Sequence, residues 1–268
     1  MRLHGAWGST KRTARAGTIS QACTCIWTKR ATTDHKFTNK LLAFRALKQG
    51  LRYSYENWRM WQNYIIVSVE VGELSEACRA LGRLVELRVE KDGVASVDIE
   101  VLERLVDAVT RAPSDEEPTD NQSEHVRNPN EGHGLFPRVY DLFNRVILPR
   151  ISKSPRIYRA WARLLAWRAT WSDVLAAHMD AYRAGVGSDP GVETDIEKFK
   201  EAVTEITELV DVLRNLGPRA QEEEINKGSW QFQARSLVRT FTGRTRAGFA
   251  DEPEWENLKK LLDDLKGE

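Results

Sequence analysis

A tryptophan followed 16 residues later by an alanine occurs twice in this chain, and this repeat constrains the fold more than any other feature. Trp61 precedes Ala77, and Trp161 precedes Ala177. Near each tryptophan, large residues recur every three or four positions, which places them on one face of a helix. The small alanine lets a second helix approach the first. Such a helix pair cannot bury its own apolar face, so neighbouring pairs must stack on it.

The same spacing is that of a tetratricopeptide repeat, a pair of antiparallel helices about 34 residues long. Glycine fits the turn between the helices, where a helix end often needs a positive φ. The predicted signature positions are Trp61, Tyr64, Gly72, Ala77 and Leu81 in the first copy and Trp161, Leu164, Ala177 and Ala181 in the second. Ala43 lies 18 residues before Trp61, which makes 43–51 a second helix whose first helix would fall near 20–38. No helical period appears there, so the chain is expected to begin in mid-repeat.

Residues 1–38 differ from the rest in composition. They are rich in lysine, arginine, serine and threonine and contain a single acid, Asp34. A basic, acid-poor start is compatible with a mitochondrial transit peptide, but a disordered basic tail or a wrongly assigned start is preferred. We therefore predict a basic segment at 1–38 and a repeat domain at 39–268.

The distance between the two tryptophans predicts an insertion. Trp61 and Trp161 are 100 residues apart, which is two periods of about 34 residues plus an insertion of about 32. Residues 113–134 are polar, acidic and without periodicity, as expected of a long loop. His125 and His133 are predicted to be solvated in it. The helix at 135–151 is predicted to follow, with Pro137 in its first turn.

The apolar period in the C-terminal part of the sequence predicts further helices. One covers 192–216 and is expected to stop at Gly217-Pro218. A basic helix follows at 229–241, and a last helix opens at 251–255 and caps the stack. Strand signals are almost absent. The predicted fold is therefore all-α: a right-handed superhelical solenoid of antiparallel helix pairs with C-terminal capping helices.

Composition excludes several functions. The net charge of +1 argues against a strongly basic nucleic-acid binder. No apolar run is long enough to span a bilayer. Three cysteines, Cys23, Cys25 and Cys78, form no disulfide framework and fit a reducing compartment, which favours the cytoplasm and, secondarily, the nucleus.

No phosphate loop, metal-ligand spacing or nucleophile motif is present. His178 is expected to be a packing or surface residue, and no catalytic residue, metal or cofactor is predicted.

Two binding modes remain open. Asn63, Arg159 and Arg163 occupy positions of first helices where a carboxylate clamp would hold a partner's C-terminus, because paired guanidiniums suit a carboxylate. The alternative for these residues is ordinary solvation.

The second mode concerns the basic helix at 229–241, whose arginines and aromatics, Trp230, Phe232 and Phe241, would contact the phosphates and bases of RNA. The alternative is that these aromatics are core and that the arginines pair with Glu222–Glu224 and with the last helix. The Trp61-Tyr64 pair also resembles RNA-processing helical repeats, although these expect a glutamate where Ser68 stands.

Four segments carry a resemblance to a known family: 43–51, 55–64, 71–77 and 232–239. Together they resemble the C-terminal half of the eukaryotic tetratricopeptide repeat protein 27 family, whose fungal members are of the Emw1 type. The resemblance covers about 40–268 and implies a non-catalytic scaffold. It further implies roles in cell-wall integrity in fungi and in chaperone-assisted assembly of a ribonucleoprotein in animals. The expected partners are therefore proteins, including chaperone machinery or assembly clients, with no membrane and no direct contact to nucleic acid.

Overall fold

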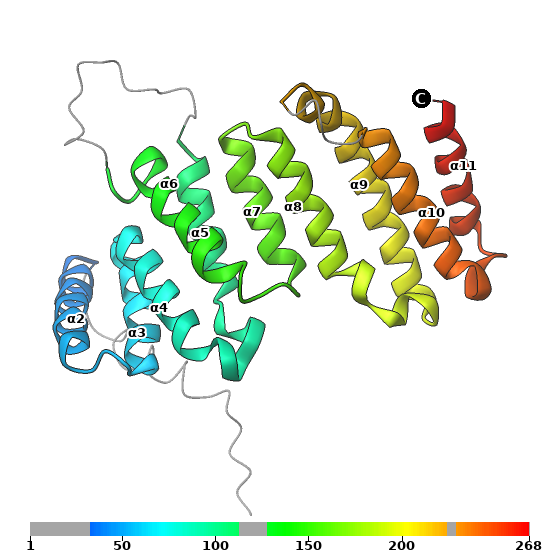
Figure 1. The fold of residues 1–268 in the computed structure, drawn as a ribbon. Coiled ribbons are helices and arrows are strands. Elements are labelled where there is room, and N and C mark those ends of the chain that lie inside the picture. Colours follow the sequence, from blue (N-terminus) through cyan, green and yellow to red (C-terminus); the bar gives the residue numbers. More distant parts are fainter. Residues whose placement is uncertain (1–32, 113–127, 224–228, 268) are drawn as a thin grey trace, which may run out of the picture.

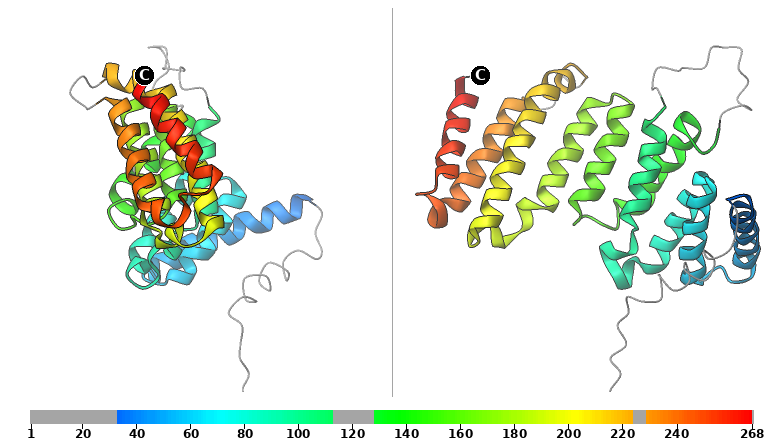
Figure 2. Two further views of the ribbon diagram at one scale, coloured as in Figure 1. Left: turned by 90° about the vertical axis from the view of Figure 1, so that its right-hand side faces the viewer. Right: turned by 180° about the vertical axis from the view of Figure 1, so that it is seen from behind.

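The computed structural model describes residues 33–112, 128–223 and 229–267, and every regular element in these ranges is helical. Figures 1 and 2 show the helices side by side in chain order, from α2 at one end to α11 at the other. The α-helices are α2 (Thr33–Tyr53), α3 (Trp58–Val71), α4 (Leu74–Asp92), α5 (Ile99–Thr110), α6 (Gly132–Asp141), α7 (Pro155–Trp167), α8 (Trp171–Ala184), α9 (Ile196–Glu223), α10 (Trp230–Phe249) and α11 (Pro253–Gly267). Short helical turns are η1 (Gly93–Ser96), η3 (Leu142–Ile147), η4 (Val186–Ser188) and η5 (Pro190–Glu193).

The helices form consecutive antiparallel pairs, α3 with α4, α5 with α6, α7 with α8 and α9 with α10 (Figure 1). Helix α2 packs on α3, and α11 packs on α10. No pair buries its apolar face alone, because each is covered by the next pair along the stack. The predicted all-α solenoid of helix pairs is confirmed.

Local signals in the sequence explain the ends of α3. The side chain of Asn57 accepts a hydrogen bond from the backbone N–H of Met60 at 3.4 Å and caps the N-terminus. Gly72 ends the helix with φ +88°, and its N–H and that of Glu73 bond back to carbonyls of the last turn. Between these ends, Trp61 and Tyr64 are buried on the face that packs against α4 and α2.

Among the described residues, the interior consists of two large apolar clusters and a small one between them. The first extends from Phe44 on α2 to Leu164 on α7, and the second covers α8 to α11. A seam of four buried residues on α7 and α8 joins them: Ala162, Leu165, Val174 and Ala177. The α7–α8 pair therefore connects the two halves of the stack.

Helix α2 begins earlier than the sequence predicted. It starts at Thr33, inside the segment assigned to 1–38, and continues to Tyr53. The division of the chain at residue 38 stays a prediction, and most of that segment, including Cys23 and Cys25, lies outside the described residues. The start of a helix is weakly marked here, because residues 33–38 show no apolar period.

The start of α6 corrects two predictions. The helix begins at Gly132, so Pro137 lies inside it rather than in its first turn. His133 is in the first turn of α6 with its ring centroid 4.7 Å from that of Trp167, so it is not a solvated loop histidine. His125 lies outside the described residues. Helix α6 then continues into η3, a π-helical turn over Leu142–Ile147.

Helix α9 corrects a third prediction, because it runs through Gly217-Pro218 to Glu223. Proline removes one intrahelical hydrogen bond, but packing decides the outcome. A Cβ at Gly217 would lie 2.4 Å from Cγ of Trp230, so the glycine allows α9 and α10 to approach closely. Past the proline, the carboxylate of Glu223 accepts hydrogen bonds from the N–H groups of Trp171 and Ser172 at the start of α8. This last turn therefore caps a neighbouring helix.

Candidate functional site

A row of ion pairs links α5, α7 and α9, the first helices of three successive pairs. On α7, Arg156 binds both carboxylate oxygens of Glu103 on α5 at 3.0 Å. Arg163, two turns later, pairs with Asp107 on α5. Between them, Arg159 reaches the other neighbour and binds Glu205 on α9 at 2.7 Å. We call this set of six side chains the ion-pair row: Glu103, Asp107, Arg156, Arg159, Arg163 and Glu205.

The ion-pair row is open to solvent. Its three arginine side chains are 51–54% exposed, and its three carboxylates are 34–45% exposed. Ion pairs at this exposure contribute about 0–1 kcal/mol each to stability, because solvent and salt screen them. A carboxylate from another molecule can therefore replace Asp107 or Glu205 on the arginines at little cost to the fold.

The structure brings two of the three predicted clamp residues together. Arg159 and Arg163 are one turn apart on α7 and belong to the ion-pair row. Asn63 is exposed on α3, two helix pairs earlier, and Figure 1 shows α3 and α7 at separate places along the stack. Asn63 therefore cannot share a single carboxylate with the arginines.

The acidic half of the ion-pair row was missed by the sequence reasoning. Glu103 and Asp107 are spaced by one turn on α5, as Arg159 and Arg163 are on α7. Matching i and i+4 charges of opposite sign on consecutive first helices are the signal that could have found them. Arg159 also lies near His178 on α8. Burial and the charge of Arg159 lower the pKa of His178, so this histidine is neutral at pH 7.

The signature residues serve the core, and Tyr64 also carries a polar network. Seven signature positions are buried: Trp61, Tyr64, Ala77, Leu81, Leu164, Ala177 and Ala181. Ala43 and Trp161 are half-buried, and Gly72 is exposed at its turn. The hydroxyl of Tyr64 donates to Glu76 at 3.0 Å, and Lys48 donates to the other oxygen of Glu76 at 3.0 Å. Burial and the neighbouring Glu76 carboxylate raise the pKa of Tyr64, which keeps its proton.

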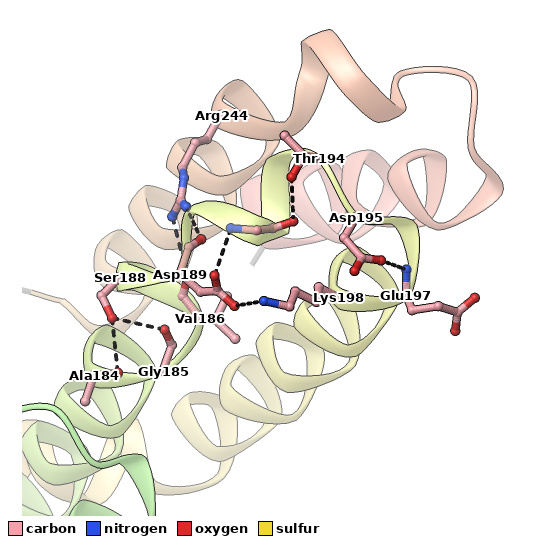
Figure 3. A network of polar contacts seen from close by, with 11 residues as sticks. Ala184, Gly185, Val186, Ser188, Asp189, Thr194, Asp195, Glu197, Lys198 and Arg244 are labelled. Carbon is pink, nitrogen blue, oxygen red and sulfur yellow. Dashed lines mark hydrogen bonds and ion pairs between the residues drawn. The ribbon is translucent and has the colours of Figure 1, made fainter. Parts of the chain in front are cut away.

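The basic C-terminal helix uses its central arginine inside the fold. Figure 3 shows Arg244 on α10 reaching the backbone carbonyl of Asp189, to which it donates at 2.7 Å. Arg244 also donates to the carbonyl of Gly187 at 3.0 Å and pairs with Glu193. Lys198 closes the same network by binding Asp189 at 2.9 Å. These contacts fasten the connection between α8 and α9 to α10. Arg244 therefore does not make the alternative pairing with Glu222–Glu224, of which Glu224 lies outside the described residues.

The aromatic side chains of this helix are mostly withdrawn from solvent. Phe241 is buried against Phe199, Trp230 is half-buried against α9, and Phe232 alone of the three is exposed, at 66%. A single exposed ring is a poor stacking platform for successive bases. The packing interpretation therefore applies to Phe241 and Trp230.

The described residues contain neither a metal-ligand cluster nor a membrane-spanning helix. In residues 33–112, 128–223 and 229–267, no three His, Cys, Asp or Glu side chains are grouped as metal ligands. Over the same residues, no helix combines the length and apolar character needed to cross a bilayer.

Comparison with known proteins gives three relatives. The chain is 30% identical over 235 residues to a tetratricopeptide repeat-containing protein of Schizosaccharomyces pombe, which covers 87% of this chain and 26% of that protein. It is 27% identical over 223 residues to Essential for maintenance of the cell wall protein 1 of Saccharomyces cerevisiae, covering 81% of this chain and 23% of that protein. A nematode protein, tetratricopeptide repeat-containing protein trd-1 of Caenorhabditis elegans, is 31% identical over 122 residues, or 46% of this chain.

The chain thus spans about a quarter of the length of the two fungal relatives. No protein-family model matches it, and no solved structure matches it significantly.

Proposed function

We propose that this chain is a non-catalytic scaffold for protein–protein interaction. The proposal follows from its homology to tetratricopeptide-repeat proteins that include the yeast Emw1 protein, a relationship that the sequence predicted. Its binding surface is the face formed by the first helices α5, α7 and α9. A partner presents a carboxylate, at its C-terminus or on an acidic side chain, to Arg159 and Arg163.

One observation carries this proposal: the arginines of α7 are fixed in place by exposed carboxylates that a partner can displace. Asp107 and Glu205 each form an exposed ion pair with one of the two guanidiniums, so the internal acceptors that a partner must displace are weakly held. An arriving carboxylate exchanges one charge-assisted hydrogen bond for another. Asn63, on the same series of first helices, serves as a separate polar contact for a longer partner.

The relatives support a setting for this scaffold. The Saccharomyces relative is named for maintenance of the cell wall, and we propose the same broad role here, exercised by holding other proteins. Chaperone machinery and clients of complex assembly are the partners we propose first, through a C-terminal carboxylate that paired guanidiniums can hold. The proposed location is the cytoplasm, with the nucleus second.

Direct RNA binding has less support. Arg244 donates to backbone carbonyls within the chain, and two of the three aromatics on α10 are packed into the protein. What remains exposed on this helix does not combine a cationic groove with a series of stacking rings.

Binding assays on the full chain distinguish the two functions. We expect peptides with a free, acidic C-terminus to bind the wild-type chain, and their C-terminally amidated forms to bind several-fold more weakly. Arg163→Glu should abolish the difference between the two peptide forms. Salt-dependent retention of single-stranded RNA by the wild-type chain, together with equal binding of free and amidated peptides, would contradict the proposal.

A further inference from the structure

A cavity of about 630 Å³ opens between α4 and the segment formed by α6 and η3. It lies on the second helices of two successive pairs, and no member of the ion-pair row lines it. The buried apolar side chains among its lining residues are Trp61, Cys78 and Leu142, which form its floor and are nearly inaccessible to solvent. Burial raises the pKa of the Cys78 thiol to about 12, so the floor is uncharged at pH 7.

The rim of this cavity, in contrast, is strongly charged. Four arginines and three acids line it: Arg79, Arg83, Arg138, Arg145, Glu76, Glu86 and Asp141. Each acid is already paired with one arginine, as Arg79–Glu76, Arg83–Glu86 and Arg145–Asp141. Glu76 also holds Lys48 from α2. Arg138 is left over, because no carboxylate in the described parts of the chain forms an ion pair with it. The rim therefore carries an excess of positive charge.

Arg83 adds a second unfilled donor. Its guanidinium lies 4.5 Å from the ring centroid of Tyr55 and binds Glu86 through Nη1. Its Nε is buried and has no hydrogen-bond partner among the described residues. A buried donor without a partner is destabilising, and an acceptor that reaches it from the cavity relieves this cost.

The wall opposite α4 has an unusual backbone. Leu142, Arg145 and Val146 belong to the π-helical turn η3. This geometry is rare in proteins, and where it occurs it is often found at functional sites. Across from it, Gly82 on α4 has no side chain, and a Cβ there would lie 3.3 Å from Cδ1 of Leu142. The glycine thus allows the two walls to approach closely at Leu142 and Val146.

From these observations we propose that the cavity is a second docking site, which receives an acidic segment of a partner protein. A carboxylate of the segment binds Arg138 and the guanidinium of Arg83, and an apolar side chain covers Leu142 and Val146. A bare anion would satisfy the arginines but would leave the apolar floor open, which is why a peptide fits better. The inference rests on the proposed scaffold function, but it shares no residue with the ion-pair row.

The test uses the full chain and a short fluorescent peptide that alternates glutamate with leucine, with fluorescence anisotropy as the readout. A peptide with lysine in place of glutamate and inorganic phosphate serve as competing probes. The variant is Arg138→Glu. Its matched control is Arg239→Glu, which makes the same charge change at an exposed mid-helix position of α10. Circular dichroism checks that both variants fold. If Arg138→Glu does not fold, Arg138→Lys, which keeps the positive charge, takes its place.

We expect Arg138→Glu to weaken binding of the glutamate peptide at least tenfold, with Arg239→Glu within twofold of wild type and Arg138→Lys within about threefold. The lysine peptide should not bind. Equal effects of Arg138→Glu and Arg239→Glu, or binding of the lysine peptide, would overturn the proposal. So would complete displacement by millimolar phosphate, which indicates a simple anion site. If Arg163→Glu removes peptide binding and Arg138→Glu does not, the peptide binds the ion-pair row, and this inference alone fails.

Discussion

Nη2 of Arg159 on α7 lies 2.7 Å from Oε1 of Glu205 on α9, 46 residues later in the chain. One turn along α7, Arg163 pairs in the opposite direction, with Asp107 on α5. Helix α7 is therefore tied through its arginines to the first helices on both sides. Since the pairs are half-exposed, they set the orientation of the side chains more than they stabilise the fold.

Removing the competing carboxylates should strengthen partner binding. In the double variant Asp107→Asn, Glu205→Gln, the two arginines of α7 lose their internal acceptors. We expect affinity for a peptide with a free acidic C-terminus to rise about three- to tenfold, which corresponds to about 0.7–1.4 kcal/mol. Stability should change by less than about 1 kcal/mol. Anisotropy titrations measure the affinity, and weaker or unchanged binding would count against exchange at the ion-pair row.

The turn between α3 and α4 should depend on glycine. Gly72 has φ +88° and open space where a Cβ would lie, so Gly72→Ala is opposed only by backbone conformation, at about 1–2 kcal/mol. Gly243 lies inside α10 with equally open space and no positive φ. Gly243→Ala should therefore stabilise by up to about 1 kcal/mol. Urea unfolding compares the two, and opposite signs are expected; destabilisation of equal size at both positions would refute this role of Gly72.

Acid should weaken the contact between α2, α3 and α4. Burial disfavours the charged form of Glu76 and alone would raise its pKa. Hydrogen bonds from Lys48, Arg79 and Tyr64 outweigh burial, so the pKa of Glu76 lies below its ordinary value of 4.5. A carboxyl whose folded pKa is depressed stabilises the protein above its unfolded pKa, and this contribution is lost as the pH falls through the folded pKa.

We therefore expect wild type to be more stable than Glu76→Gln at pH 7. The difference should shrink as the pH falls below about 4.5, the ordinary value for this carboxyl. Thermal melts from pH 7 to pH 3 measure it. A difference that stays constant over this range would show that the charge of Glu76 contributes nothing.

The connection between α8 and α9 should loosen when its arginine is shortened. Arg244→Lys cannot reach two carbonyls and Glu193 at once, because an ammonium lacks the planar fork of a guanidinium. We expect a loss of about 1–3 kcal/mol and faster amide hydrogen exchange over Val186–Glu193. The exposed Arg246→Lys on the same helix should change neither measurement. Unchanged amide hydrogen exchange in Arg244→Lys would show that the connection between α8 and α9 does not depend on Arg244.

Much of the architecture could be predicted because it depends on local spacing. The positions of Trp61, Ala77, Trp161 and Ala177 follow from the helical period alone, and the pairs α3–α4 and α7–α8 lie where that period places them. Gly72 was predictable as well, because a left-handed helix end is a local requirement.

The rest depends on contacts between distant segments. Pro218 is a local stop signal, but the packing of Gly217 against Trp230 and the cap that Glu223 gives to α8 keep the helix going. His133 was assigned to a loop because its partner, Trp167, comes 34 residues later. The ion-pair row joins residues 46 to 56 positions apart, so no short window of sequence contains both partners.

Affinity purification of the full chain, followed by cross-linking mass spectrometry, tests the central claim most directly. Wild type and Arg163→Glu are compared, with Arg239→Glu as the control for charge reversal. We predict that partner proteins cross-link to α5, α7 and α9, and that Arg163→Glu loses them while Arg239→Glu retains them. Capture of the same partners by Arg163→Glu at wild-type levels, with cross-links away from these three helices, would contradict the account.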